Sequence, residues 1–412
     1  MDLLQPIIKP YAWGSRDALA RLQGRSTPSA GPEAELWMGA HPSGAAGTTR
    51  GGQATTLLDV VAEDPHRELG AACVREFGDR LPFLLKVLAA EQPLSIQVHP
   101  DREQARSAFA AQQAEGGGGP YADDWPKPEL LHALSRFEVL AGFRDREEAA
   151  QLLENLGVDG LRPVIGLLRG GTDAQGLSEA LRAVLERAPD ERAPLVSAVV
   201  ESSRRLARSA NPHAAAYAAL VRMARHHPDD LGLVASLLLN HRVLEPGTAL
   251  FMPAGGLHAY VHGVGLELLA NSDNVLRAGL TAKEVNVPEL LRITNPAVRV
   301  PVVTPTGVAG PGPTWLYDCP AREFALYKTE LDGSHGPLVP ATGPRIAFCA
   351  DGSARLSTGG TEPLRLAAGS SCFLPASDED VLVEGRGTLF VAAVGLSPDK
   401  PSSLVQDSPP LN

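Results

Sequence analysis

Cysteine is scarce in this sequence, with only four in 412 residues. They lie far apart and form no Cys-x-x-Cys pair, at Cys73, Cys319, Cys349 and Cys372. That pattern suits a reducing cytosol better than a disulfide framework. Long apolar runs are missing too, since no stretch reaches the ~18 residues of a membrane helix. Residues 1–14 lack the charged and apolar regions of a signal peptide. We therefore expect a cytoplasmic protein.

Positively charged residues are also fewer than negatively charged ones. Lys and Arg total 37 against 48 Asp and Glu, a formal charge of −11, and no basic stripe stands out. Nucleic acid and membrane are therefore not expected as partners. An anionic small substrate is still compatible, because a few cations in a cleft can override net charge. We expect a monomer or weak homo-oligomer.

The length predicts two or three domains, and 41 glycines with 35 prolines indicate many turns and much β structure. Residues 144–227 differ, because their apolar residues recur at helical spacing, beginning with Ala149, Leu152, Leu153 and Leu156. We expect mainly β structure with a helical insertion. The predicted parts are a catalytic domain at 1–143 and 228–295, a helical domain at 144–227, a C-terminal β domain at 296–396 and a polar tail at 397–412.

One segment of the chain echoes another. LEPGTALFMPAG at 244–255 matches LAAGSSCFLPAS at 366–377 in Leu, Gly, Phe, Pro and Ala, 122 residues apart. This could be chance, or it could mark two copies of a β-sandwich unit. At the same offset His258 maps onto Asp380. The second copy would then have lost a polar centre, and we predict that it binds no metal.

The stretch 81–101 (LPFLLKVLAAEQPLSIQVHPD) carries the first chemical signal. An apolar run is followed by strict alternation, which predicts strands, and the Glu-Gln-Pro break between them predicts a hairpin. Ser95, Gln97 and His99 share one face of the second strand. That face is either solvated or lines a cavity in which Gln97 and His99 bind something together.

Two further segments supply candidate ligands. Glu129 follows Lys127 and Pro128 in an extended segment, because a proline disfavours helix at the residue before it. His258 and Tyr260 lie on one face of another predicted strand. Gln97, His99, Glu129 and His258 together form a nitrogen and oxygen set that suits zinc, with iron and manganese as alternatives. Without a thiolate, and with room for water or substrate, such a site is typical of catalysis.

Residues 267–283 (ELLANSDNVLRAGLTAK) place charges among small and apolar residues. Glu267, Asp273, Arg277 and Lys283 are either scattered charges of a surface loop or parts of a functional site. Thr281 to Glu284 has the form of a capping box, which predicts a helix start there and helix over 288–293.

These motifs together, LPFLLKVL, PLSIQVHPD, KPEL, PAGGLHAY and GLELLANSDNVLRAGLT, closely resemble the type I phosphomannose isomerase family. The resemblance runs from about Tyr11 to Glu289, whereas the C-terminal part is similar in architecture only. It implies cupin-type β-sandwich or jelly-roll domains, catalytic and C-terminal, and a zinc-dependent interconversion of mannose 6-phosphate and fructose 6-phosphate. Two departures are Trp125-Pro126, where the family usually has Asn-His, and Ala282, where it has Pro.

Carried over residue by residue, the resemblance implies one zinc per chain on Gln97, His99, Glu129 and His258. Arg277 matches an arginine with a catalytic role. The other matched residues of the catalytic pocket are Lys86, Lys127, Tyr260, Glu267 and Asp273. Ser95 and Lys283 match positions that hold the substrate phosphate.

Such an isomerisation moves a proton between C1 and C2 through an enediol and needs a general base. Glu267 and Lys127 are both candidates. Two other functions fit parts of the pattern. One is a cupin dioxygenase, which would usually show two histidines and one carboxylate on iron. The other is a sugar-phosphate-binding protein without catalysis.

Overall fold

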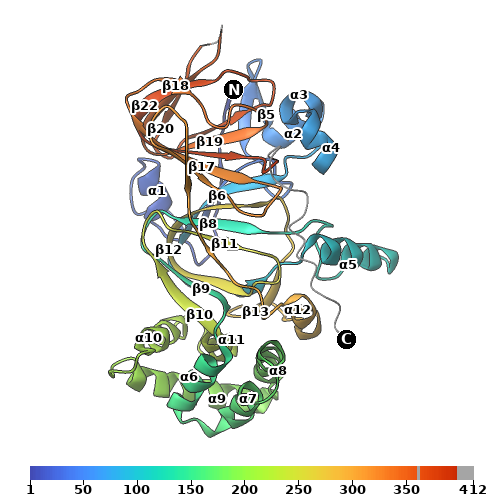
Figure 1. The fold of residues 1–412 in the computed structure, drawn as a ribbon, viewed down its shortest axis with the longest axis vertical. Coiled ribbons are helices and arrows are strands. Elements are labelled where there is room, and N and C mark those ends of the chain that lie inside the picture. Colours follow the sequence, from blue (N-terminus) through green and yellow to red (C-terminus); the bar gives the residue numbers. More distant parts are fainter. Residues whose placement is uncertain (360–361, 397–412) are drawn as a thin grey trace.

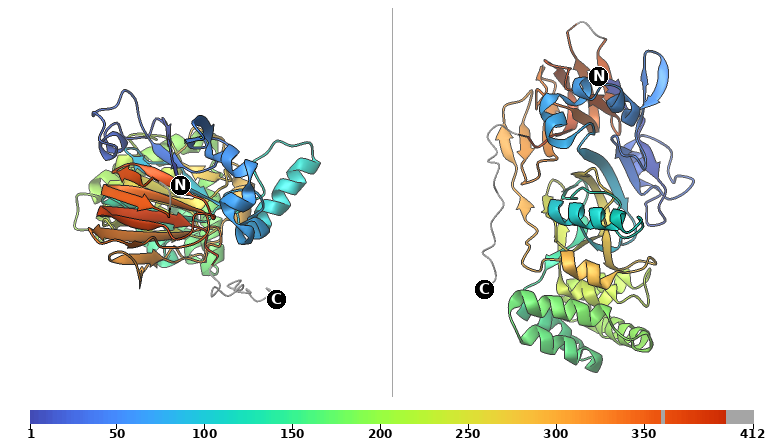
Figure 2. Two further views of the ribbon diagram at one scale, coloured as in Figure 1. Left: turned by 90° about the horizontal axis from the view of Figure 1, so that it is seen from above. Right: turned by 90° about the vertical axis from the view of Figure 1, so that its right-hand side faces the viewer.

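The computed structural model describes residues 1–359 and 362–396, so the predicted tail at 397–412 lies outside the described residues. Two β-sheets and a block of helices follow one another along the long axis of the molecule (Figure 1). The sheet nearest the C-terminus of the sequence is at one end, the helical block is at the other, and a first sheet lies between them. The right-hand view of Figure 2 shows the same order. This arrangement confirms a mainly β fold with a helical insertion.

The first sheet has its main strands in the order β14-β11-β8-β12-β6-β3-β2. Its core strand β6 (Phe83–Ala90) is buried at all eight positions, which explains why that run is almost wholly apolar. The other strands of this path are β14 (Val302–Val303), β11 (Ala249–Met252), β8 (Glu129–Ala133), β12 (His258–Ala270), β3 (Glu35–Met38) and β2 (Ile7–Lys9).

Strand β12 organises this sheet. Its second half, Gly263–Ala270, pairs with β6 and overlaps β8 on the other side. Its first half pairs with β9 (Phe137–Phe143) and, at His258, with β7 (Ile96–Val98). β7 also pairs with β13 (Leu276–Gly279), and β9 with β10 (Leu239–Leu244). The hairpin predicted across residues 91–93 is therefore wrong, because β6 and β7 each pair with β12 instead of with each other.

The helical block packs on the outer side of this sheet. Its apolar stripes are buried as their spacing predicts, and they share one core with Ile96 and Val98 of β7. The first helix ends at Gly157, whose φ of 65° is left-handed, the conformation that glycine adopts at low cost. The helices are α6 (Arg146–Leu156), α7 (Arg162–Arg169), α8 (Asp173–Leu185), α9 (Pro189–Leu206), α10 (Ala214–Met223) and α11 (Gly232–Ala235).

The second sheet repeats the strand order of the first, as β1-β21-β19-β22-β17-β16-β15. Strands β11 and β21 begin and end 122 residues apart (371 − 249 = 122; 374 − 252 = 122), the spacing of the sequence echo. The strands are β1 (Asp2–Leu3), β21 (Ser371–Leu374), β19 (Arg345–Ser357), β22 (Leu382–Ala393), β17 (Ala325–Asp332), β16 (Thr314–Tyr317) and β15 (Thr306–Val308).

The two sheets pack on each other through a common core. Phe83 and Leu266 of the first sheet belong to the same buried cluster as Phe324, Phe348 and Phe390 of the second. β1 pairs with β21 of the second sheet. The chain therefore passes from the second sheet to the first after β1 and returns to the second sheet after β14. Short strands β4 (Gly47–Arg50), β5 (Gln53–Thr56), β18 (Gly336–Pro337) and β20 (Leu364–Ala367) complete the β structure described.

The remaining helices lie outside the helical block. α12 (Val287–Ile293) begins later than the capping box predicted, because Asn286 and not Thr281 caps it by accepting from the Glu289 N–H. Five of these helices had no counterpart in the sequence analysis, namely α1 (Ala18–Leu22), α2 (Leu57–Glu63), α3 (Pro65–Leu69), α4 (Ala71–Phe77) and α5 (Arg102–Ala114). Within the described ranges, no helix is long and apolar enough to cross a membrane, and the four cysteines are buried and form no disulfide.

Candidate metal centre and active site

Three buried side chains from three strands meet at one point. His99 follows β7, Glu129 opens β8 and His258 opens β12, so each stands at a strand end. Nε2 of His99 lies 3.2 Å from Oε1 of Glu129, and Nε2 of His258 lies 3.2 Å from Oε2. One nitrogen or oxygen atom from each residue lies within 4.8 Å of the others. Such spacing allows all three to bind a single ion.

Gln97 joins this group through the register of β7. It is paired with His258 of β12 on one side and with Arg277 of β13 on the other, so the three residues form a row across the strands. The Gln97 amide nitrogen lies 3.5 Å from Nε2 of His258. Since amide N and O are assigned from surroundings, a flip would turn the amide oxygen toward the same point.

The histidines are held with one nitrogen free for a metal. Nδ1 of His99 is 2.7 Å from the carbonyl oxygen of Asn274, and Nδ1 of His258 is 3.0 Å from that of Gly256. A carbonyl can only accept, so each Nδ1 donates and each Nε2 keeps its lone pair. Nε2 of His99 is buried and makes no hydrogen bond among the described residues, although Glu129 is close. A buried atom left in this way suits a metal ligand.

Burial and neighbouring charges set the ionisation of these ligands. Burial lowers the pKa of His99 to about 4, so its imidazole is neutral at neutral pH. Burial opposes ionisation of Glu129, but the Lys127 ammonium beside it holds the pKa of this carboxylate well below its ordinary value. Two imidazole nitrogens with one carboxylate form a donor set of the kind that binds zinc. The residues present therefore fit the metal predicted from the sequence.

A second charged group adjoins the first. Nζ of Lys86 lies 3.3 Å from Glu267 on the neighbouring strand and 3.8 Å from Glu35 on β3. Burial acts to lower the pKa of Lys86, but the two carboxylates outweigh it and raise it. Burial raises the pKa of Glu267. Tyr260 donates to Glu129 across 3.4 Å and also interacts with Glu267, so it links the two groups.

Lys127, Arg277 and Asp273 stand around this centre in different ways. Nζ of Lys127 is 3.4 Å from Oε1 of Glu129. Arg277 is half-buried, and among the described residues it has no carboxylate partner within ion-pair distance. Asp273 is 45% exposed and faces His41, 3.5 Å from its Nε2, and Ser43. The structure therefore brings Lys127 to the metal ligands directly, whereas Asp273 contacts residues of the 41–43 loop.

The two residues expected at the phosphate are not joined by any contact that the structure shows. Ser95 is half-buried just before β7. Lys283 is exposed and lines a cavity of about 440 Å³ with Arg192, Asp230 and Thr281. Lys283 also lies before α12 and not within its first turn.

Two groups beside the site were not assigned to it from sequence. Glu35 accepts from Trp37 Nε1 at 2.6 Å, and its carboxylate lies 3.8 Å from Nζ of Lys86. The alternation of Glu35 and Trp37 with Leu36 was the available signal. Asn274 lies in the ANSDN motif, yet nothing in its spacing shows that its carbonyl meets His99.

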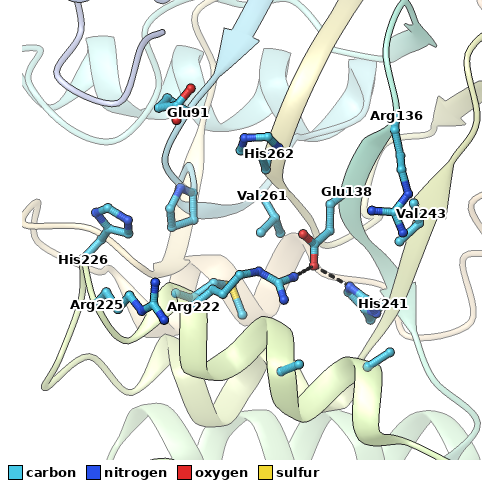
Figure 3. Close-up of a pocket in the computed structure, with 14 residues that line it drawn as sticks. Glu91, Arg136, Glu138, Arg222, Arg225, His226, His241, Val243, Val261 and His262 are labelled. Atoms are coloured by element: carbon cyan, nitrogen blue, oxygen red, sulfur yellow. Dashed lines mark hydrogen bonds and ion pairs between the residues drawn. The ribbon is translucent and has the colours of Figure 1, made fainter. Parts of the chain in front are cut away.

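A separate cavity of about 490 Å³ lies between α10 and the outer face of the sheet (Figure 3). Figure 3 shows Arg222 and His241 directed at Glu138 in its centre. His241 is 2.7 Å from Glu138, and Arg222 also pairs with it. The carboxylate is thus already satisfied, and this cavity does not contribute to the metal centre.

Fold and site together define a cupin-type protein with a buried histidine and carboxylate metal centre. Residues 1–146 match the model of the phosphomannose isomerase type I catalytic domain, and residues 319–394 match that of the mannose-6-phosphate isomerase cupin domain. Mannose-6-phosphate isomerase of Escherichia coli K12 is 36% identical, over 94% of this chain and 98% of its own length. The human protein of the same name is 32% identical, over 90% and 92%.

Solved structures agree with these sequence relatives. A crystal structure of a phosphomannose isomerase mutant from Salmonella typhimurium has a TM-score of 0.87 at 33% identity, and 96% of this chain and all of that chain are covered. A zinc-bound mannose 6-phosphate isomerase has a TM-score of 0.86 at 33% identity, with 96% and 99% covered. The chain belongs to the mannose-6-phosphate isomerase family, type I, which confirms the resemblance noted in the sequence.

Proposed function

We propose that this chain is a zinc-dependent isomerase that interconverts D-mannose 6-phosphate and D-fructose 6-phosphate through an enediol. The observation that carries the proposal is the buried convergence of His99, Glu129 and His258 in a chain whose relatives along nearly its whole length are mannose-6-phosphate isomerases. A cupin dioxygenase is disfavoured, because a fourth donor, Gln97, stands beside the three ligands.

Gln97, His99, Glu129 and His258 would hold one Zn²⁺ per chain. Bound there, zinc would polarise the sugar oxygens and stabilise the charge that develops as a proton leaves C1 or C2. The carbonyls of Asn274 and Gly256 accept from Nδ1 of the two histidines, which orients each ring with its Nε2 toward the metal position.

We assign the proton transfer to Glu267 in preference to Lys127. Its carboxylate is 3% exposed, and burial raises its pKa toward the range in which a carboxylate is an effective base. Lys86, 3.3 Å away, moderates that shift and keeps the carboxylate in place. Lys127 lies 3.4 Å from Glu129 and would orient that ligand and the sugar oxygens. Tyr260 would buttress both carboxylates, and Asp273 would close the pocket from the 41–43 loop.

Arg277 would stabilise the enediolate oxygen. A half-buried guanidinium without a carboxylate partner is costly unless an anion meets it, and the register of β7 and β13 puts it beside Gln97. Ser95 and Lys283 would hold the substrate phosphate, remote from the reacting carbons. The support is their match to the family motif and, for Lys283, the second cation Arg192 in the same cavity.

A coupled assay tests the function. The purified chain should convert mannose 6-phosphate to fructose 6-phosphate, lose that activity when a chelator removes the metal, and regain it with one equivalent of Zn²⁺. Oxygen uptake with any substrate, or tight binding of the sugar phosphate without turnover, would instead establish one of the two other functions.

We also propose that the protein is cytoplasmic and monomeric or a weak homo-oligomer, and that it binds no nucleic acid. Four cysteines that form no disulfide in the described residues and a charge of −11 support this. Catalysis would lie in residues 1–143 and 228–295, with 144–227 as a helical domain, 296–396 as a cupin-like domain and 397–412 as a tail. Gel filtration and a nucleic-acid binding assay test the first part.

A further inference from the structure

We propose that Asn274 is a positioning residue that sets the orientation of His99 relative to the segment carrying Lys127 and Glu129. It would thereby shape the metal site without touching metal or substrate. The inference deepens the proposed zinc function and rests on it. Its evidence is a set of hydrogen bonds that ties two ligand-bearing segments to one residue.

The hydrogen bonds of the Asn274 side chain all go to residues 122–125, the segment that leads into Glu129. Its Oδ1 accepts from the N–H of Ala122 at 2.8 Å and of Asp123 at 3.3 Å. Its Nδ2 donates to the carbonyls of Asp123 and Trp125, both at 2.8 Å. At 1% exposure, this amide uses both its donors and its acceptor inside the protein.

The main chain of the same residue holds a metal ligand. The carbonyl of Asn274 accepts from Nδ1 of His99 at 2.7 Å, the bond that directs Nε2 toward Glu129. A displacement of Asn274 would therefore tilt the His99 ring and, at the same time, move residues 122–125, which lead into Glu129. Outer-shell bonds of this kind orient ligands and tune metal affinity.

Asp123 also joins these two segments, residues 122–125 and residues 272–274, whose contact we call the junction. Its carboxylate accepts from the Ser272 hydroxyl at 2.7 Å and from the Asp273 N–H at 2.9 Å. It also accepts from Trp125 N–H at 3.0 Å within its own loop. Each of the two segments thus both donates hydrogen bonds to the other and accepts them from it, which limits their relative movement.

The junction also explains how the chain accommodates Trp125-Pro126. Asn274 bonds to main-chain atoms of residues 122–125, so it does not depend on which side chains stand at 125 and 126. The Trp125 ring packs instead against Phe77, and the Arg80 guanidinium lies 3.7 Å from a ring centroid. The departure from the family pattern is therefore accommodated where the loop packs on the hydrophobic core, through the contact of Trp125 with Phe77.

The test compares Asn274→Ala with Asn271→Ala. Asn271 is a matched control, since it is also buried and donates to main-chain carbonyls, those of Ala40 and Leu81, which lie outside the junction. Zinc affinity is measured by chelator competition without substrate, and the visible spectrum of the Co²⁺ form reports ligand geometry. We expect Asn274→Ala to bind zinc roughly 10–100-fold more weakly with an altered cobalt spectrum. Asn271→Ala should keep both.

Equal zinc affinity in the two variants, with the same cobalt spectrum, would overturn the proposal and leave Asn274 a purely structural residue. If Asn274→Ala does not fold, Asp123→Asn takes its place, because it keeps the side-chain shape but replaces one accepting oxygen by an amide nitrogen. That nitrogen would face either the Asp273 N–H or the donors of Ser272, Trp125 and Asn274, and it cannot accept from them. A zinc affinity in that variant equal to the Asn271→Ala value would count against the proposal in the same way. Failure of the proposed function is recognised separately, as wild-type protein that binds no zinc or does not isomerise mannose 6-phosphate.

Discussion

The two sheets have the same strand order but opposite chemistry at a matched position. In the first, Met252 of β11 is paired with Glu129 of β8. In the second, Leu374 of β21 is paired with Arg345 of β19. Met252 and Leu374 are equivalent in the sequence echo, so the buried Glu129 carboxylate in one unit stands where a buried arginine stands in the other.

The arginine has its own partners. Arg345 donates to the carbonyls of Pro340, Ala341, Pro375 and Asp378, and His258 is replaced at the echo offset by the exposed Asp380. A buried guanidinium repels a cation, whereas Glu129 and the unbonded Nε2 of His99 attract one. The first unit thus presents ligand atoms to a cation, whereas in the second the two terminal nitrogens of Arg345 donate to main-chain carbonyls. The second unit is a packing partner on this view, and our prediction that it binds no metal remains to be tested.

Removing a ligand from the first unit should have the largest effect. His99→Ala and His258→Ala should each lose zinc and reduce kcat/KM by more than the roughly 10–100-fold typical of outer-shell partners. Metal analysis and the coupled assay measure this. Full zinc occupancy with normal rates in both variants would contradict the proposal that these histidines bind the metal, and with it the contrast between the two units.

Arg277→Ala should come next. If the guanidinium acts on the charge that develops in the transition state, kcat should fall about 10²–10³-fold with little change in KM. Steady-state kinetics on zinc-loaded protein provide the measurement. A raised KM with unchanged kcat would reassign Arg277 to ground-state binding.

Arg345→Met in the second unit should affect stability and not chemistry. Carbonyls that lose their donor are left buried, and we expect the free energy of unfolding to fall by about 2–3 kcal/mol. Urea unfolding measures the loss, while kcat per folded molecule should remain that of the wild type. An equal fall in kcat would show that the second unit takes part in catalysis.

The contact between the sheets should respond to acid. Burial lowers the pKa of His132 to about 4, and its ring packs on Phe390 and meets the Tyr317 hydroxyl at 3.2 Å. Between about pH 4 and the unfolded value near 6.5 the unfolded chain binds a proton that the native chain does not, so stability falls as pH falls. The loss from this group should reach up to about 3 kcal/mol. Zinc-loaded His132→Gln should show a flatter dependence, and an unchanged slope would contradict this origin.

Lys283→Ala should have the smallest effect. Loss of one phosphate contact should raise KM for mannose 6-phosphate by about 10-fold, on the order of 1.4 kcal/mol, with zinc retained. The poor reaction with unphosphorylated mannose should hardly change. Equal losses on the two sugars, or none on either, would remove Lys283 from the phosphate site.

Local patterns in the sequence predicted local structure well. The stripe from Ala149 to Leu156 became a helix ended by Gly157, because both period and cap lie within a dozen residues. The echo at 244–255 and 366–377 fell on equivalent strands. The hairpin at 91–93 failed because strand partners are chosen by long-range packing, and β12 lies more than 150 residues downstream of β7.

The ligand set could be assembled from residue types, but its surroundings could not. Gln97, His99, Glu129 and His258 were each visible as polar residues in apolar segments. The bond from Asn274 to His99 uses a main-chain carbonyl, which carries no sequence signal. Helix α5 was missed although Asp101 and Gln104 form a capping box, because its exposed positions leave a weak apolar stripe.

The pairing of β1 with β21 has a consequence for synthesis on the ribosome. Asp2 and Leu3 are translated long before Phe373 and Cys372, the residues that pair with them. The β1 segment therefore cannot close its sheet edge until both β-sheet units and the helical block between them have been made. Until then the backbone donors and acceptors of β1 lack their native partners and are open to pairing with other chains.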